Sequence, residues 1–224
     1  MFSGGKDSVF ALWYAQMQGW DVVSLVTVLP ESKESWMFHF PAVEWTGLQA
    51  DAIGIPRKIV RTRGVKEDEL EDLKFGLRCL IESFGIEGIV SGAIASDYQR
   101  TRLDNVCEEI GVRSFAPLWH KNQQQLIREQ VDAGFEIIVT ACSALGLTAD
   151  WLGRRLDQES VEELVKLSEK YGLNVAFEGG EAETFVLAGP MFNGRIEVTR
   201  SSKRWFRDSG YLNLEELRLI PRKT

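Results

Sequence analysis

The sequence has few cysteines and few histidines, and this shortage excludes two classes of protein. Its 224 residues include two histidines and three cysteines, which are Cys79, Cys107 and Cys142. No two cysteines form a C-x-x-C pair, so the spacing argues against a zinc ribbon and against a secreted disulfide framework. We therefore expect a reducing, cytoplasmic setting.

Long apolar runs and long basic runs are also missing. No stretch approaches the ~18 apolar residues of a membrane span, and no basic segment followed by an apolar one precedes the fold. The chain has 26 basic against 33 acidic residues, a net charge of −7, and no basic run reaches five residues. We therefore expect no membrane association and no direct nucleic-acid binding; a protein or a small molecule is the better substrate.

The chain begins MFSGGKDSVFALWYAQMQG, which places a glycine pair and a lysine directly before a predicted helix. Glycines leave main-chain N–H groups open to a ligand, and the helix N-terminus adds its positive dipole end, so this loop suits phosphate. The spacing fits neither Walker A nor the Rossmann fingerprint. From the residues alone, a Gly-Gly turn capped by Asp7 or Ser8 is the alternative.

All six positions of this loop, residues 3–8, match the S-G-G-x-D-S loop of the PP-loop ATP pyrophosphatases. The resemblance implies cleavage of ATP between its α and β phosphates, giving AMP and pyrophosphate. It assigns nucleotide binding to Ser3, Gly4, Gly5, Lys6, Asp7 and Ser8.

Hydrophobic periodicity divides the chain into two parts. In the first, apolar runs at 21–29, 57–62, 88–93 and 112–118 read as strands that alternate with helices, among them an amphipathic helix over 66–85. Such alternation predicts a parallel α/β sheet. The second part reads as a helix (121–134), a strand (135–142), a capped helix (157–172) and terminal antiparallel strands. We expect a parallel-sheet PP-loop nucleotide domain over 1–120 and a smaller, closely packed α+β domain over 121–224.

Only Met1 and Phe2 precede the loop, although a phosphate loop in an α/β sheet normally follows a strand. A buried strand contributes several large side chains at ~1.5–3 kcal/mol each, which is comparable to the net stability of a domain. We therefore expect the natural chain to extend further upstream; the alternative is a sheet that lacks much of a central strand.

A run of small residues ends the third predicted strand. These residues, Ser91, Gly92 and Ala93, leave room for a ligand at the carboxyl edge of the sheet, where such folds bind nucleotides. We predict that the nucleotide lies between this segment and the 3–8 loop.

The segment that follows, ASDYQRTR, reads as the start of a helix. Ser96 and Gln99 form a capping box, which is the alternative to a functional role for this stretch. Capping does not require Tyr98, Arg100 or Arg102. The two arginines could hold a phosphate or a substrate carboxylate with paired N–H donors. The SWMFH segment adds Trp36 and His39, for which local packing and a solvated histidine are the alternative.

The segment FEGGEAETFVLAGPMF sets three carboxylates around a glycine pair, just before a predicted strand. Glu178, Glu181 and Glu183 would repel one another unless a cation or a positively charged substrate lies among them. An acidic, solvent-facing turn is the alternative interpretation.

Five segments together, SGGKDS, SWMFH, SGAIASDYQRTR, WLGR and EGGEAETFVL, occur in this order and at these separations in the diphthine:ammonia ligases, a branch of the PP-loop ATPases. The resemblance covers essentially the whole chain. It implies that ATP and ammonium amidate the carboxylate of diphthine, a modified histidine of translation elongation factor 2, through an acyl adenylate. The family segment commonly continues with an aspartate where this chain has Ala188, so we assign no role to that position.

The resemblance also implies roles for single residues. A catalytic role falls to Asp7, Arg100, Glu181 and Glu183. Contact with the acceptor falls to Trp36, His39, Tyr98, Arg102, Glu178, Gly179, Gly180 and Thr184. Magnesium would bridge phosphate oxygens with Asp7 as its protein partner. A homo-oligomer is left open.

Free ammonium is the expected nitrogen donor, because no cysteine and histidine motif of a glutaminase follows the nucleotide half. Two alternatives remain from the sequence. The first is another PP-loop enzyme, either tRNA-modifying or amidating a small molecule, although thiolation of tRNA usually needs paired cysteines and a basic surface. The second is a nucleotide sensor that retains the loop and catalyses nothing.

Overall fold

We analysed a computed structural model, which describes residues 1–30, 42–62 and 68–222. The first part of the chain has the elements α1 (Lys6–Met17), β1 (Leu25–Pro30), η1 (Val43–Trp45), α2 (Thr46–Ile53), β2 (Arg57–Thr62), α3 (Asp68–Phe84), β3 (Gly88–Val90), α4 (Asp97–Ile110) and β4 (Arg113–Phe115). The second part has α5 (Gln123–Asp132), β5 (Glu136–Cys142), η2 (Ala149–Trp151), β6 (Arg155–Leu156), α6 (Gln158–Tyr171), β7 (Ala182–Ala188), β8 (Gly194–Phe206) and β9 (Ser209–Pro221).

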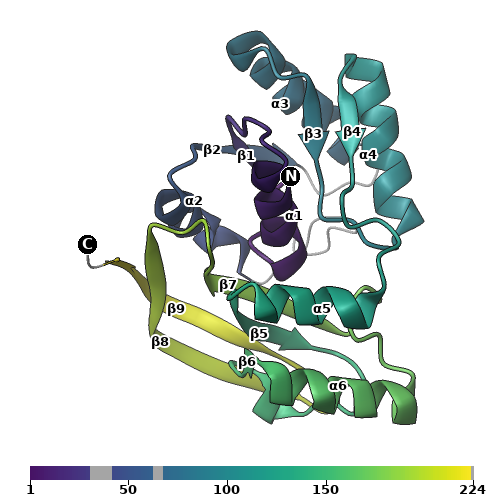
Figure 1. Cartoon of the computed structure of the whole chain (residues 1–224), viewed down its shortest axis with the longest axis vertical. Helices are drawn as coiled ribbons and strands as arrows, with labels where there is room; N and C mark the ends of the chain where they lie inside the picture. Colours follow the sequence, from purple (N-terminus) through teal and green to yellow (C-terminus); the bar gives the residue numbers. More distant parts are fainter. Residues whose placement is uncertain (31–41, 63–67, 223–224) are drawn as a thin grey trace.

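The first part contains two parallel strand pairs, β1 with β2 and β3 with β4, and α1 lies between them in Figure 1. The first two residues link the pairs. The Met1 amine donates to the carbonyl of Val90 at 2.6 Å, and the Phe2 N–H donates to the carbonyl of Val26 at 2.7 Å. Met1 and Phe2 therefore take the central position of the sheet and lead directly into the 3–8 loop.

The predicted parallel α/β arrangement is confirmed, although three of its strands are shorter than expected. β1 begins only at Leu25, because its partner β2 begins after Pro56, whose carbonyl accepts from the Leu25 N–H. β3 ends at Val90, since the next residues turn toward α1. β4 covers only residues 113–115, and the chain then turns. The predicted strand at 57–62 coincides with β2.

The second part is an antiparallel sheet with strand order β6-β5-β9-β8, in which β7 also pairs with β5. Figure 1 shows α5 and α6 packed along this sheet and the long β8–β9 ribbon at its outer side. The predicted terminal antiparallel strands are thus confirmed. The α6 helix begins at a capping box of Asp157 and Ser160 and ends at Gly172, whose φ of 73° suits glycine.

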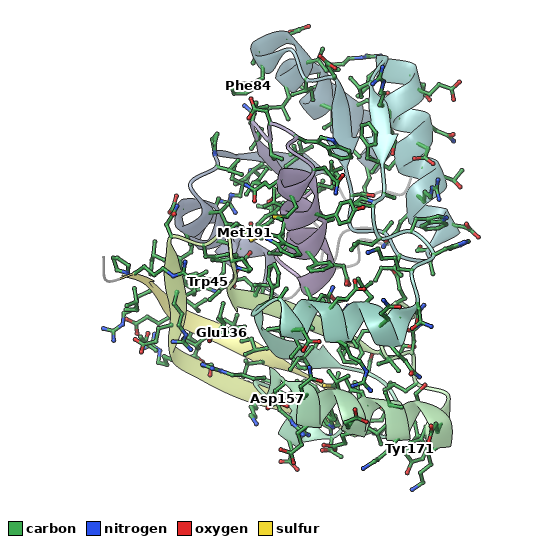
Figure 2. All side chains as sticks on the ribbon, viewed as in Figure 1. Trp45, Phe84, Glu136, Asp157, Tyr171 and Met191 are labelled. Atoms are coloured by element: carbon green, nitrogen blue, oxygen red, sulfur yellow. The ribbon has the colours of Figure 1, made fainter. Side chains whose placement is uncertain are left out.

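One hydrophobic cluster runs through both parts of the chain. Phe10 of α1 meets Phe135 edge to face, with 5.6 Å between the ring centroids. Trp45 lies where α2 meets the ribbon and donates from its indole nitrogen to the carbonyl of Leu214 at 2.9 Å (Figure 2). A second cluster fills the space between β1, β2, β3 and helices α3 and α4. The predicted close packing of the two halves is therefore confirmed.

Across the residues described here, the helices are too short or too polar to cross a membrane.

Candidate active site

Three segments that lie far apart in the sequence line one cavity of about 280 Å³. They are the 3–8 loop, the small residues 91–93 that follow β3, and residues 176–184 around the start of β7. The first two are the segments between which we predicted the nucleotide. The third carries the glutamates, so the carboxylates and the loop face the same space.

The 3–8 loop is held open toward the cavity by its own residues. Gly4 has a φ of 81°, and a Cβ there would lie 2.3 Å from Oε1 of Gln49, so this position needs glycine on both counts. Gly5 caps α1 without a side-chain hydrogen bond. The hydroxyls of Ser3 and Ser8 lie 3.1 Å apart, and Ser8 also donates to the carbonyl of Gly5. Neither Asp7 nor Ser8 provides a side-chain cap at Gly5; the N–H groups of Gly5 and Lys6 donate instead to the hydroxyls of Ser3 and Thr184.

Lys6 and Asp7 form an ion pair at the wall of the cavity. The Lys6 amine lies 2.6 and 2.8 Å from the two carboxylate oxygens of Asp7 and donates to the carbonyl of Ala176 at 2.7 Å. Its side chain is only 2% exposed. Gln130 of α5 donates to the same carboxylate at 2.9 Å. In this structure Lys6 therefore neutralises Asp7, and a ligand phosphate or a magnesium ion would have to compete for these groups.

Gln130 was not predicted from the sequence. It is buried, and its Oε1 has no hydrogen-bond partner in the structure. Its place in the helix QQQLIREQ resembles that of the other polar residues there, so no sequence signal distinguishes it.

Among residues 91–93, Gly92 is needed for close packing. A Cβ at Gly92 would lie 2.6 Å from the main-chain nitrogen of Ser8 and 2.7 Å from the carbonyl carbon of Asp7. Only glycine lets this segment approach the first turn of α1 so closely. Ser91 and Ala93 are buried and line the cavity beside it.

The three glutamates have different surroundings. Glu178 accepts a 2.9 Å hydrogen bond from the N–H of Ile94, which ties its turn to the segment after β3. Burial raises the pKa of Glu178, and the charge of Asp7 raises it further. Glu181 accepts from the N–H groups of Asn174 and Gly179, at 3.2 and 2.8 Å, and does not line the cavity. In the structure Glu181 therefore stabilises the backbone of the turn through these two hydrogen bonds.

Glu183 lines the cavity, and within the described parts of the chain no group donates a hydrogen bond to its carboxylate. Burial raises the pKa of Glu183 to about 7, while Lys6 lowers it and Asp7 raises it. A carboxyl group that titrates near neutral pH beside an ion pair is suited to proton transfer.

Two side chains fasten the loop to β7. The Lys6 N–H donates to the hydroxyl of Thr184 at 3.1 Å, and the Val186 N–H donates to the carbonyl of Gly4 at 3.1 Å. The amide nitrogen of Gln49, which is fully buried, donates to the carbonyls of Gly4 and Val186 at 2.9 and 2.8 Å. Gln49 could not be identified as a site residue from the sequence, because its partners come from distant segments.

The turn of the EGGE segment includes a non-glycine residue in the left-handed region. Phe177 has a φ of 65°, is buried and lines the cavity, and the Lys6 amine lies 5.8 Å from its ring centroid. Such a conformation in an aromatic residue stores strain and is characteristic of functional sites. Gly180 is also left-handed, with a φ of 78°, and lines the cavity, whereas Gly179 does not.

The α4 residues lie differently from the prediction. The Ser96 side chain accepts from the N–H of Gln99, so the predicted cap at Ser96 is confirmed, but within the described residues the Gln99 side chain makes no return bond that would complete the capping box. Arg100 stacks on Trp119, 4.4 Å from the ring centroid, and pairs with Asp104.

Two further residues of α4, Tyr98 and Arg102, contact each other outside the cavity. The guanidinium of Arg102 lies 4.4 Å from the ring centroid of Tyr98. The cavity lining does not include Tyr98, Arg100 or Arg102, but it does include Gln99, for which the sequence predicts only a part in the capping box. Trp36 and His39 lie outside the described residues.

The described residues contain no group of three or more histidine, cysteine, aspartate or glutamate side chains that could hold a metal ion. The three cysteines are free, and burial raises the pKa of Cys107 to about 11 and that of Cys142 to about 12. A divalent cation at this site would therefore need oxygen ligands from a bound substrate in addition to a carboxylate.

Two family models match the chain. The model described as the diphthamide synthase N-terminal domain matches residues 1–114, and the model described as the diphthamide synthase C-terminal domain matches residues 122–220. The chain belongs to the diphthamide synthase family of two-part proteins.

Several curated relatives that are similar over nearly the whole chain share the name diphthine–ammonia ligase. The proteins named diphthine–ammonia ligase from Bos taurus and Homo sapiens are each 35% identical over 243 residues, which cover 98% of this chain and 91% of theirs. That from Danio rerio is 34% identical and covers 88% of this chain and 84% of its own. A solved structure, described as a predicted subunit of tRNA methyltransferase from Methanocaldococcus jannaschii, is 15% identical to this chain with a TM-score of 0.45. The match covers 85% of this chain and 95% of that one.

Proposed function

We propose that this chain is an ATP-dependent ligase that amidates the carboxylate of diphthine with ammonia, giving diphthamide, AMP and pyrophosphate. The observation that carries the proposal is the single cavity shared by the 3–8 loop and Glu183. Membership of the diphthamide synthase family and the name of its relatives supply the substrates. The proposed acceptor is elongation factor 2 that bears diphthine.

The 3–8 loop fits the phosphates of ATP. Gly5 brings no side chain to the start of α1, and the positive end of the helix dipole faces the cavity, although the Lys6 N–H already donates to the hydroxyl of Thr184. The hydroxyls of Ser3 and Ser8 line the same wall. The cavity volume of about 280 Å³ is close to the lower limit of about 300 Å³ that is usual for ligand pockets.

Magnesium, when bound, would neutralise phosphate charge and help pyrophosphate to leave. Asp7 is the carboxylate that would hold it, and Glu183 lies in the same cavity. Because Lys6 and Gln130 already engage Asp7, we propose that nucleotide binding rearranges this ion pair.

The chemistry requires activation of a poor acyl donor. The diphthine carboxylate attacks the α-phosphorus of ATP, and pyrophosphate leaves. Ammonia then attacks the acyl carbon of the adenylate, and AMP leaves. The attacking nitrogen must lose a proton, and Glu183, with a pKa of about 7 and no hydrogen-bond donor, is the proposed acceptor of that proton.

The other glutamates and the arginines receive supporting roles in this proposal. Glu178 holds the turn to the segment after β3, and Glu181 shapes it. Arg100 and Arg102 lie outside the cavity, and their contact with the acceptor protein stays a proposal. Trp36 and His39 keep their predicted contact with the acceptor.

The test is release of AMP and pyrophosphate by the purified protein, with elongation factor 2 that bears diphthine, with the same factor after amidation, and without it. We expect release only with the diphthine form and ammonium together, and one amide formed for each AMP by peptide mass. Release that needs tRNA or a free carboxylic acid instead would identify another PP-loop ligase. ATP binding without any turnover would identify a sensor.

A further inference from the structure

An acceptor that is a folded protein needs more surface than the mouth of the cavity offers. Stable protein complexes bury roughly 800 Å² on each partner. The cavity has a volume of only about 280 Å³, and the exposed residues of its lining include Gly180 in the turn before β7 and Gln99 of α4. The acceptor must therefore also rest on the surface beside this turn.

Exposed apolar side chains gather around that turn. Among the described residues after 120, five large hydrophobic side chains are exposed, and four belong to segments that contact or neighbour the turn. These four are Leu145 (75% exposed), Tyr171 (39%), Phe206 (60%) and Tyr211 (42%). Single exposed apolar residues are ordinary, but a group of them indicates a binding surface.

Leu145 and Tyr171 reach the turn through their neighbours. Ser143, two residues before Leu145, donates from its N–H to the carbonyl of Glu181 at 2.8 Å and from its hydroxyl to the carbonyl of Gly180. A Cβ on Gly146 would lie 2.7 Å from the ring of Tyr171, so the loop that carries Leu145 packs on the end of α6. Figure 2 shows Tyr171 at that end of the helix.

Phe206 and Tyr211 come from the closed end of the β8–β9 ribbon. In the sheet Cys142 pairs with Ala182 on one side and with Gly210 on the other. Two strand spacings of ~4.8 Å place Gly210 about 10 Å from Ala182. Ala182 lines the cavity.

The same end of the ribbon carries more positive than negative charge, with the exposed Arg204 and Arg207 against the exposed Asp208. Arg204 lies directly opposite Tyr211, and the rings of Phe206 and Tyr211 stack with 6.3 Å between their centroids. Arg207 occupies the turn with a φ of 50°. Within the described part of the chain, neither Arg204 nor Arg207 has an ion-pair partner, although the protein as a whole carries a net charge of −7.

We infer that this surface, made of Leu145, Tyr171, Arg204, Phe206, Arg207 and Tyr211 and called here the rim surface, docks the protein acceptor. The inference rests on the proposed function and adds to it the place where the acceptor binds. The acceptor face is acidic, because unpaired arginines beside aromatic rings favour a partner that supplies carboxylates. RNA is the less favoured partner, since two arginines neutralise few phosphates.

Two double variants test the inference. Arg204→Glu with Arg207→Glu reverses the charge, and Phe206→Ser with Tyr211→Ser removes the stacked rings. All four side chains are exposed, so both proteins should fold, which circular dichroism checks. The matched control is Phe75→Ser with Arg78→Glu, an exposed aromatic and an exposed arginine on α3.

The measurement is the dissociation constant for purified elongation factor 2 bearing diphthine, by calorimetry without ATP. We expect each rim variant to bind about tenfold more weakly or worse, and the control to stay within about twofold of the wild type. Wild-type binding should weaken as salt is raised. In amidation assays kcat/KM for the factor should fall with the affinity, while kcat at saturation and the affinity for ATP are retained.

Rim variants that bind the factor as the wild type does would overturn the inference and leave the proposed amidation intact. Loss of binding to an RNA oligonucleotide with unchanged binding to the factor would overturn it as well. Because the titration needs no turnover, a wild type that binds the factor through this surface but forms no amide would refute the amidation and support the docking surface.

Discussion

The main-chain N–H of Lys6 donates a 3.1 Å hydrogen bond to the hydroxyl of Thr184, a residue 178 positions further along the chain. One donor at the start of α1 is thus taken up by the strand that carries the glutamates. The position of the proposed phosphate site therefore depends on β7. A substitution of Thr184 should weaken ATP binding, although the sequence predicts contact with the acceptor for this residue.

The two glycines of the loop should respond differently to alanine. Gly4→Ala places a side chain at a φ of 81° and against Gln49, so the free energy of unfolding should fall by about 1–3 kcal/mol. Gly5 has a φ of −76°, and a Cβ there would lie 3.4 Å from the carbonyl oxygen of Thr184, which is an ordinary contact. Gly5→Ala should therefore fold normally and bind ATP more weakly. Thermal melting and calorimetric titration measure the two effects; equal ATP affinity in a folded Gly5→Ala protein would mean that the loop only caps α1.

The buried amide of Gln49 should be irreplaceable by a carboxylate. Gln49→Leu removes one donor from the carbonyls of Gly4 and Val186, of which Gly4 still accepts from the Val186 N–H, and it also removes an Oε1 that has no partner, so a net loss of about 1–3 kcal/mol is expected. Gln49→Glu directs a carboxylate at the same two carbonyls and should cost more than the leucine does at pH 8. Urea unfolding of both variants gives the order, and a glutamate variant as stable as the wild type would contradict the bonding described here.

Glu183 should make both stability and activity depend on pH near neutrality. Its pKa rises from 4.5 to about 7 on folding, so its stabilising contribution is complete below pH 4.5 and is lost as the pH rises to about 7. The loss is at most about 3 kcal/mol, and Glu183→Gln should not show it. As a proton acceptor Glu183 works when ionised, so kcat/KM should increase with a midpoint near pH 7 and fall about 100-fold or more in the variant. Denaturant melts and rate profiles from pH 5 to 9 measure both; identical profiles for the two proteins would exclude this role.

Glu181 should be far less sensitive than Glu183. Its two oxygens accept from the N–H groups of Asn174 and Gly179, and glutamine retains one of these acceptors. Glu181→Gln should therefore reduce amidation only a few-fold and should lower the free energy of unfolding by about 1 kcal/mol. Amidation rates of the two glutamine variants, measured side by side with ATP binding, decide the order. A loss in Glu181→Gln as deep as that in Glu183→Gln would restore Glu181 to the catalytic group.

Local signals in the sequence predicted the elements well. The caps at Ser96 and Asp157, the glycine that ends α6 and the run RKIVRT each act within a few residues, and the structure shows each as expected. The motifs also indicated the segments that line the cavity, because glycine and small residues mark close approach of backbones.

The contacts between segments could not be predicted in the same way. Gln49 and Gln130 matter because of partners more than a hundred residues away, and nothing in their neighbourhoods distinguishes them. The guanidinium of Arg100 could bind an anion, and the sequence predicts a catalytic role for it. In the structure it stacks on the ring of Trp119 and does not line the cavity. Which of several charged residues faces a site is decided by tertiary packing.

The amide of Gln49 touches the first loop of the chain and a strand near its end, and this has a consequence for how such proteins can be exchanged in evolution. A hybrid with its first 120 residues from one relative and the remainder from another would join the glutamine and the loop of one parent to a strand of the other, with which they had never been selected. Such hybrids should be rescued by transferring residues 46–53 and 182–188 from the same parent, so the two segments are expected to be inherited as a pair.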